Sequence, residues 1–183
     1  DRLDDWDFPR SGRFLSASYE QSFDVFGDDV PYRKGSVELQ QAFGRDRHSL
    51  ALSARHGNAF GSTLPLVEAF TLGGFQNLSG FGDRQFQSNR ASFGRAVYAY
   101  QIGASGAVVK GFYAGGSLEV GEVSERLNVA SPTVNVLEIG RKREWVMAGS
   151  AFLSTDTALG PLYLAVGIGE GGERAYYLFL GRP

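Results

Sequence analysis

The stretch Phe70-Thr71-Leu72-Gly73-Gly74-Phe75-Gln76-Asn77-Leu78-Ser79-Gly80-Phe81-Gly82-Asp83-Arg84-Gln85-Phe86 decides how the rest of the chain is interpreted. It contains four glycines and four phenylalanines, and its apolar residues follow neither the period of a strand nor that of a helix. An exposed loop of this length is normally polar. Because this one is aromatic and rich in glycine, we expect a loop whose backbone packs closely against another part of the chain.

Segments on both sides of this loop alternate between apolar and polar residues, which is the pattern of β-strands. In the first of them Leu15, Ala17 and Tyr19 share one face, and Ser16 and Ser18 lie on the other. One later segment, 144–154, is apolar on both faces, so its pattern does not indicate which face is the outer one. The alternation predicts strands over 12–21, 32–43, 48–56, 91–102, 111–122, 144–154, 162–169 and 174–181, with the stub of a ninth strand before the first.

The composition indicates one all-β domain. The 183 residues include 25 glycines, 14 phenylalanines and 8 tyrosines, as in β-proteins with many tight turns. A net charge of −2 argues against a nucleic-acid-binding surface, and the absence of cysteine excludes disulfides and Cys-based zinc sites. The chain opens on charged residues without a signal peptide, which indicates a cytosolic protein or a piece of a longer precursor.

The predicted connections differ systematically in length. Short turns are expected at 9–12, 44–47, 103–110 and 155–161, and longer loops at 22–31, 57–89 and 123–143, with the hairpin turn at 170–173 as the exception. Short turns at one end and long loops at the other are typical of outer-membrane β-barrels, whose strands need only about 10 residues of alternating pattern. No run of about 18 apolar residues encodes a transmembrane helix.

Catalytic and metal-binding patterns are weak. The two histidines, His48 and His56, would lie about 26 Å apart on one strand and cannot share a metal. Ser49 follows His48 and points to the opposite face, so the two do not form a catalytic pair. The glycine-rich loop lacks the lysine of a P-loop. We therefore expect no catalytic residue, metal site or cofactor in this chain. Arg141-Lys142-Arg143 is interpreted as a solvated charge run, with lipopolysaccharide phosphates as the alternative partner.

Taken together, these motifs resemble one family. Leu72-Gly73-Gly74 followed by Leu78-Ser79-Gly80-Phe81 resembles the motif on the long sixth extracellular loop of the bacterial surface antigen superfamily, which includes the outer-membrane assembly insertase and two-partner secretion transporters. Asp7-Phe8-Pro9-Arg10-Ser11-Gly12 resembles the periplasmic turn three strands earlier. The segments 157–162 and 177–181 resemble the last two strands. The resemblance spans residues 1–183 and implies an antiparallel transmembrane β-barrel segment of eight to nine strands, in which 57–89 is a lumen-inserted loop.

The chain departs from the family pattern in the loop and at its end. Ser79 stands where the family usually has an arginine that pairs with the barrel wall. Arg84 is then the expected donor, and Glu119 the expected acceptor, of a substitute loop-to-wall pair. The Leu-Ser-Gly form of the motif most resembles the translocator barrels fused to patatin-like phospholipases, the type Vd autotransporters. The chain ends at Arg182-Pro183 without the aromatic terminal residue of an outer-membrane strand.

The resemblance also implies a role. The family barrel has about sixteen strands, so the chain corresponds to its C-terminal half and is expected to close with missing N-terminal strands or with a second copy in a homodimer, or to stay an open sheet. The implied function is an outer-membrane anchor and translocator for an upstream patatin-like phospholipase passenger, without chemistry of its own. Outer-membrane lipids and the barrel assembly machinery are the expected partners. The alternatives are the barrel of an assembly or secretion transporter, and a small stand-alone β-barrel that binds an apolar ligand.

Overall fold

A computed structural model describes residues 2–4, 8–23, 31–61, 64–103, 109–126, 139–157 and 159–181. The side chains of 109–110, 123–126 and 139–143 are not described. The predictions for Asp7, Ala158 and Arg182-Pro183 therefore lie outside the described residues, as do the side chains of Arg141-Lys142-Arg143. The described residues contain two 3-10 helices of three residues each, and no helix there is long and apolar enough to cross a membrane.

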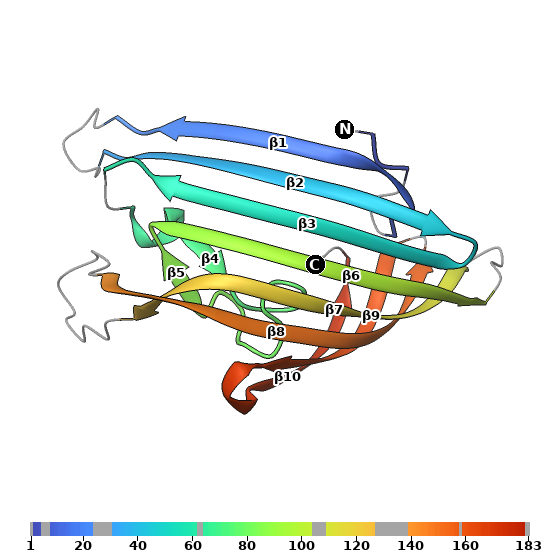
Figure 1. Cartoon of the computed structure of the whole chain (residues 1–183). Coiled ribbons are helices and arrows are strands. Elements are labelled where there is room, and N and C mark those ends of the chain that lie inside the picture. The colour runs from blue at the N-terminus through green and yellow to red at the C-terminus, as the bar shows by residue number, and fades with distance from the viewer. Residues whose placement is uncertain are drawn as a thin grey trace.

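Eight long antiparallel strands form one curved sheet (Figure 1). Each strand pairs with the next one in the chain, except that β3 and β6 pair across the long loop. The loop contains a second sheet of two short strands, β4 (Phe70–Leu72) and β5 (Phe86–Ser88), which the sequence did not predict. The strands of the main sheet, in spatial order, are β1 (Ser11–Gln21), β2 (Arg33–Arg45), β3 (His48–Ala59), β6 (Arg90–Gly103), β7 (Val109–Arg126), β8 (Ile139–Thr157), β9 (Gly160–Gly169) and β10 (Arg174–Leu180).

The predicted strands are all present, and the main differences lie at their ends. The segment 155–161 was predicted as a turn, but β8 runs to Thr157 and β9 starts at Gly160. Backbone pairing continues through this segment, where Thr155 and Asp156 are the register partners of Leu162 and Pro161. At the start of the chain the predicted stub is not a regular strand, although Arg2 and Asp4 donate backbone hydrogen bonds to β1.

The two faces of the sheet have opposite character. On β7, Leu118 is 75% exposed, whereas its neighbour Glu119 is only 4% exposed. The same register settles the face of β8 that the sequence left open: Trp145 and Met147 are exposed, and Phe152 is buried. We call the face that carries Leu118 the outward face and the other the inner face. Large exposed side chains of the outward face include Leu15, Tyr19, Val37, Leu39, Phe43, Leu52, Tyr98, Phe112, Leu118, Met147, Leu164, Ile168, Tyr176 and Leu178.

The eight strands do not close on themselves. Within the described residues β1 pairs only with β2, and β10 only with β9. The chain therefore forms a curved wall with two open edges rather than a complete small barrel (Figure 1).

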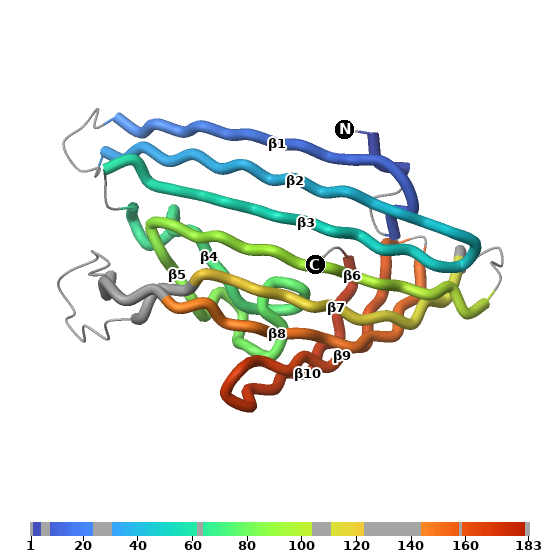
Figure 2. Tube along the Cα trace, in the orientation of Figure 1, coloured from blue at the N-terminus to red at the C-terminus, as the bar shows by residue number. Residues whose placement is uncertain are grey.

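The apolar core lies between the inner face and the long loop. One cluster joins Phe8 and Phe75 to aromatic residues of β8 and β9. A second joins Leu72, Leu78 and Phe81 to Phe93 of β6. Figure 2 shows the path of the chain, which leaves β3, folds back beneath the sheet and rejoins it at β6. The sheet and the loop thus depend on each other for burial.

Candidate functional site: the docked loop

The loop between β3 and β6 carries the sequence motif and contains one 3-10 helix, η1 (Leu66–Glu68). Its β4 (Phe70–Leu72) and β5 (Phe86–Ser88) bring the two ends of the motif together as a narrow hairpin. The motif itself is irregular, as its lack of period predicted. All seven predicted motif residues are buried, namely Leu72, Gly73, Gly74, Leu78, Ser79, Gly80 and Phe81.

Glu119 on the inner face of β7 is the main polar seat for this loop. One carboxylate oxygen accepts hydrogen bonds from the backbone N–H groups of Leu78 and Ser79, each 2.6 Å long. The other accepts a bond of 2.8 Å from the Ser79 hydroxyl and a further one from Ser117 of the same strand. A buried carboxylate is costly unless its oxygens are paired, and here the loop pairs them. Glu119 thus recognises the backbone of the loop as well as one side chain.

The backbone at the motif is shaped to present those donors. Leu78 adopts a left-handed conformation with a φ of 74°, which is unusual for a branched residue. Its side chain is fully buried. The Ser79 hydroxyl also accepts a hydrogen bond of 2.9 Å from the N–H of Gln76. Ser79 therefore links the turn internally and also links it to β7. Ser79 occupies the position where the family pattern has an arginine.

Gly80 brings the loop into direct contact with β9. It has a φ of 98°, and a Cβ atom there would lie 2.2 Å from the backbone nitrogen of Gly169. On the strand side, a Cβ at Gly167 would lie 2.4 Å from the backbone nitrogen of Gly80. The Tyr177 hydroxyl of β10 bridges this contact, since it accepts from Gly80 N–H and donates to the Phe81 carbonyl, both at 3.3 Å. Two backbones can approach this closely only without side chains between them.

Two arginines on the inner face hold the first half of the motif. Arg95 on β6 donates a hydrogen bond of 3.0 Å to the carbonyl of Gln76. Arg55 on β3 donates one of 2.6 Å to the side-chain oxygen of Asn77 and lies over the ring of Phe93. A polar cavity of about 180 Å³ remains between these groups; it is lined by Glu38, Ser53, Arg55, Gln76, Asn77, Phe93 and Arg95.

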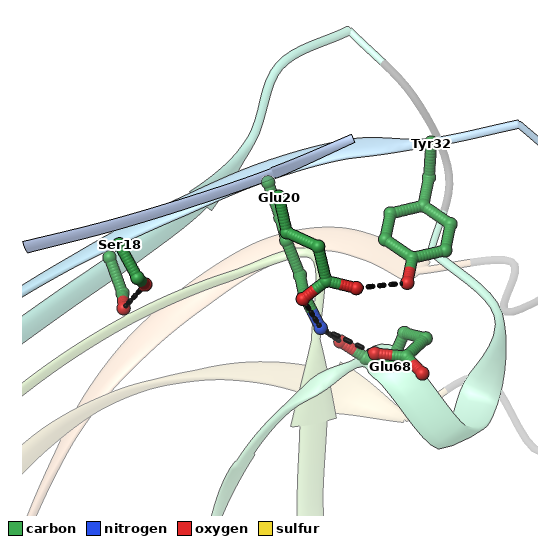
Figure 3. A network of polar contacts seen from close by, with 6 residues as sticks. Ser18, Glu20, Tyr32 and Glu68 are labelled. Carbon is green, nitrogen blue, oxygen red and sulfur yellow. Dashed lines mark hydrogen bonds and ion pairs between the residues drawn. The ribbon is translucent and has the colours of Figure 1, made fainter. Parts of the chain in front are cut away.

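A further network ties η1 to the first two strands (Figure 3). Lys34 of β2 lies 2.5 Å from the carboxylate of Glu68 in η1 and 3.4 Å from that of Glu20 in β1. Tyr32, just before β2, donates its hydroxyl to Glu20. That hydrogen bond to a carboxylate raises the pKa of Tyr32 well above its usual value. The start of the loop is thus fixed by charge at one end of the sheet.

The sequence predicted that Arg84 and Glu119 form a loop-to-wall pair. Arg84 is exposed and has a left-handed φ of 49°. The carboxylate of Glu119 is buried and receives Leu78, Ser79 and Ser117. The pair stays a prediction, and its test is rescue of single charge reversals by the double reversal.

The hydrogen bonds of Glu119, Arg95, Arg55 and Tyr177 hold the loop against the sheet. No group of three or more His, Cys, Asp or Glu placed to hold a metal ion occurs among the residues that the structure describes.

Comparisons with known proteins agree with this geometry. The model of the Omp85 superfamily domain matches residues 1–120, more than half of the chain. The chain belongs to the Omp85 superfamily. This confirms the surface antigen part of the resemblance seen in the sequence. Members of the Omp85 superfamily are outer-membrane proteins of Gram-negative bacteria, and membership indicates a β-barrel role of transporter or assembly type. Searches of curated proteins and of solved structures gave no significant match.

Proposed function

We propose that this Omp85 chain forms part of the wall of an outer-membrane β-barrel and that its outward face contacts lipid. The observation that carries the proposal is the band of exposed large apolar side chains on that face, opposite the inner face on which the loop packs. On β7 the outward residues from Phe112 to Val120 are apolar or glycine. Eight residue steps cover about 27 Å of strand, comparable with the roughly 25 Å apolar band of such barrels.

In this proposal the loop lies within the lumen and braces the wall. Its contacts reach β3 through Arg55, β6 through Arg95, β7 through Glu119 and β10 through Tyr177. A loop that is hydrogen-bonded to these four strands resists changes in the curvature of the sheet between them. The brace therefore maintains the barrel shape and restricts the lumen.

The open edges of β1 and β10 bear on how the barrel closes. An unpaired strand edge exposes backbone donors and acceptors that cannot be left in lipid. The wall therefore needs further strands, supplied by an N-terminal part of the protein or by a second copy of the chain. A small stand-alone barrel is disfavoured because its first and last strands would pair with each other, which β1 and β10 do not do.

We further propose that the wall serves as anchor and translocator for a passenger domain located upstream, of the patatin-like phospholipase class. The support is the Leu78-Ser79-Gly80-Phe81 form of the motif, in which Ser79 replaces an arginine–wall pair by hydrogen bonds to Glu119. Any hydrolytic step would belong to the passenger, and this segment would contribute no catalytic group. The barrel assembly machinery would insert the wall. If the reading frame upstream encodes no hydrolase domain, the passenger proposal fails while the barrel proposal stands.

The lipid contact is tested by single cysteines, since the chain contains none. Leu118→Cys lies on the outward face and Val67→Cys lies in η1; the native side chains are 75% and 88% exposed. In native membranes a water-soluble maleimide should label the cysteine at 67 and spare that at 118, whereas a lipid-soluble maleimide should label 118. Equal labelling of both by the water-soluble reagent would refute the lipid contact.

A further inference from the structure

A polar row interrupts the outward face near the loop end of the sheet. His56, Ser92 and Glu122 occupy neighbouring strands β3, β6 and β7 and are direct partners in register. His56 Nδ1 lies 2.9 Å from the Ser92 hydroxyl, which donates to Glu122 Oε2 at 3.0 Å. Arg90, two residues before Ser92 on β6, places its Nε 3.9 Å from the same oxygen.

The hydrogen bonds define which atoms of this row remain available. A carboxylate only accepts, so the Ser92 proton goes to Glu122. Ser92 must then accept from His56 Nδ1–H, which leaves Nε2 as the ring nitrogen outside the row. Glu122 is only 8% exposed, whereas His56 is exposed and the Arg90 side chain is 43% exposed. The row therefore presents an imidazole and a guanidinium at the surface, with its carboxylate underneath.

An apolar groove of about 420 Å³ begins next to this row. Its floor is formed by the small residues Gly94 and Ala96, which follow Ser92 on the same face of β6. Leu118, Val120 and Met147 form its side. From Ser92 to Ala96 the strand covers about 13 Å. The exposed Arg90 guanidinium beside an apolar groove of this size matches a ligand with an anionic head and a hydrocarbon chain.

We propose that His56, Arg90 and the groove form a binding site for an anionic, phosphate-bearing membrane lipid. The phosphate oxygens accept from the Arg90 guanidinium and from Nε2–H of His56, whose ring is doubly protonated in the complex because Nδ1–H stays on Ser92, and one acyl chain lies over Gly94 and Ala96. Arginine is suited to phosphate because its planar donors match the oxygen geometry. The inference rests on the proposed contact between the outward face and lipid. It adds that one lipid is selected at one place on that face.

Trp145 provides a direct readout. It is the register partner of Glu122 on β8, and it is 60% exposed. The chain has two tryptophans, so Trp6→Phe leaves Trp145 as the only one. The reporter protein is reconstituted in phosphatidylcholine vesicles that contain either brominated phosphatidic acid or brominated phosphatidylcholine. We expect the anionic lipid to quench Trp145 with about tenfold higher apparent affinity, the order for one charge-assisted hydrogen bond.

Variants distinguish recognition of the lipid headgroup from contact with the acyl chain. Arg90→Gln and His56→Gln should each reduce the preference for phosphatidic acid severalfold; Arg45→Gln, at the other end of the sheet, should not. Gly94→Leu should lower quenching by both lipids near the row, because its Cβ fits 3.6 Å from Val120 and the longer side chain fills the groove. Ala17→Leu, an exposed outward position on β1, is the matched control.

The outcomes distinguish the two proposals. Equal quenching by both brominated lipids in a folded protein would overturn the lipid site while leaving the lipid contact intact. A preference that survives both Arg90→Gln and His56→Gln would also overturn it. No quenching by either lipid would refute the lipid contact itself, and the site with it.

Discussion

Replacing Glu119 by alanine should release the loop from the wall while leaving the strands paired. The change removes the acceptor for two buried backbone donors, Leu78 N–H and Ser79 N–H, and for the Ser79 hydroxyl. A buried donor left without a partner costs about 1–3 kcal/mol. Two such donors destabilise the docked loop by about 2–6 kcal/mol, which shifts its docking equilibrium by at least about thirtyfold.

Hydrogen exchange of residues 70–86, measured by mass spectrometry in detergent micelles, reports this equilibrium. We expect much faster exchange in this segment in Glu119→Ala than in the unmodified protein. Glu119→Gln should lie between them, because its remaining oxygen still accepts but without the charge. Glu173→Ala, the same change at an exposed position in the turn after β9, is the control and should leave exchange in 70–86 unchanged.

Two results would refute the reasoning. If exchange of 70–86 in Glu119→Ala equals that of the unmodified protein at the same folded fraction, Glu119 does not seat the loop. If exchange rises equally over all strands, the carboxylate supports the sheet rather than the docking of the loop.

Gly80→Ala should lower the heat-modifiable folded fraction on gels, since its Cβ would meet the β9 backbone; Gly171→Ala, also at positive φ but with nothing within 4 Å, should cause only a small loss. Wild-type behaviour of Gly80→Ala would contradict the close approach. Ser79→Ala should weaken docking by about 1–2 kcal/mol, less than Glu119→Ala, because the backbone donor remains; the same exchange measurement checks it. Burial acts to raise the pKa of Asp4, but hydrogen bonds from the backbone, Ser11 first, outweigh it and lower that pKa. Their contribution to the turn is therefore complete above about pH 4 and is lost as the pH falls through the lowered value, so amide protection of Ser11 should fall in acid, and Asp4→Asn should show no such dependence.

Much of the fold was predictable from local patterns. Alternation located the eight strands of the main sheet, and the lack of period located the loop. The outer face of 144–154 was not predictable, because Trp145 and Val146 are both apolar and only the register with β7 and β9 distinguishes them. The short strands β4 and β5 were missed, since three residues are too few to show a period.

The site was predictable in its residues but only partly in its contacts. The motif indicated a packed loop, and Glu119 was singled out because it lies on a polar face. That backbone N–H groups of the loop would engage it could not be inferred, since no sequence pattern reports where a turn points its donors. The row of His56, Ser92 and Glu122 was missed for a related reason. These residues lie far apart in the chain, and only the pairing of β3 with β6 across the loop brings them together.

The seat of the loop on β9 and β10 has a consequence for the order of assembly. Most neighbouring strands are joined by hairpins, so their pairing needs only local closure of the chain. The contact between Gly80 and Tyr177 instead joins residues 97 positions apart. Contacts of such long sequence separation form slowly, because the chain entropy is lost before the contact is gained. During synthesis the motif emerges before β9 and β10, so the contacts of Gly80 with these strands form only after the wall has curled to its last strand.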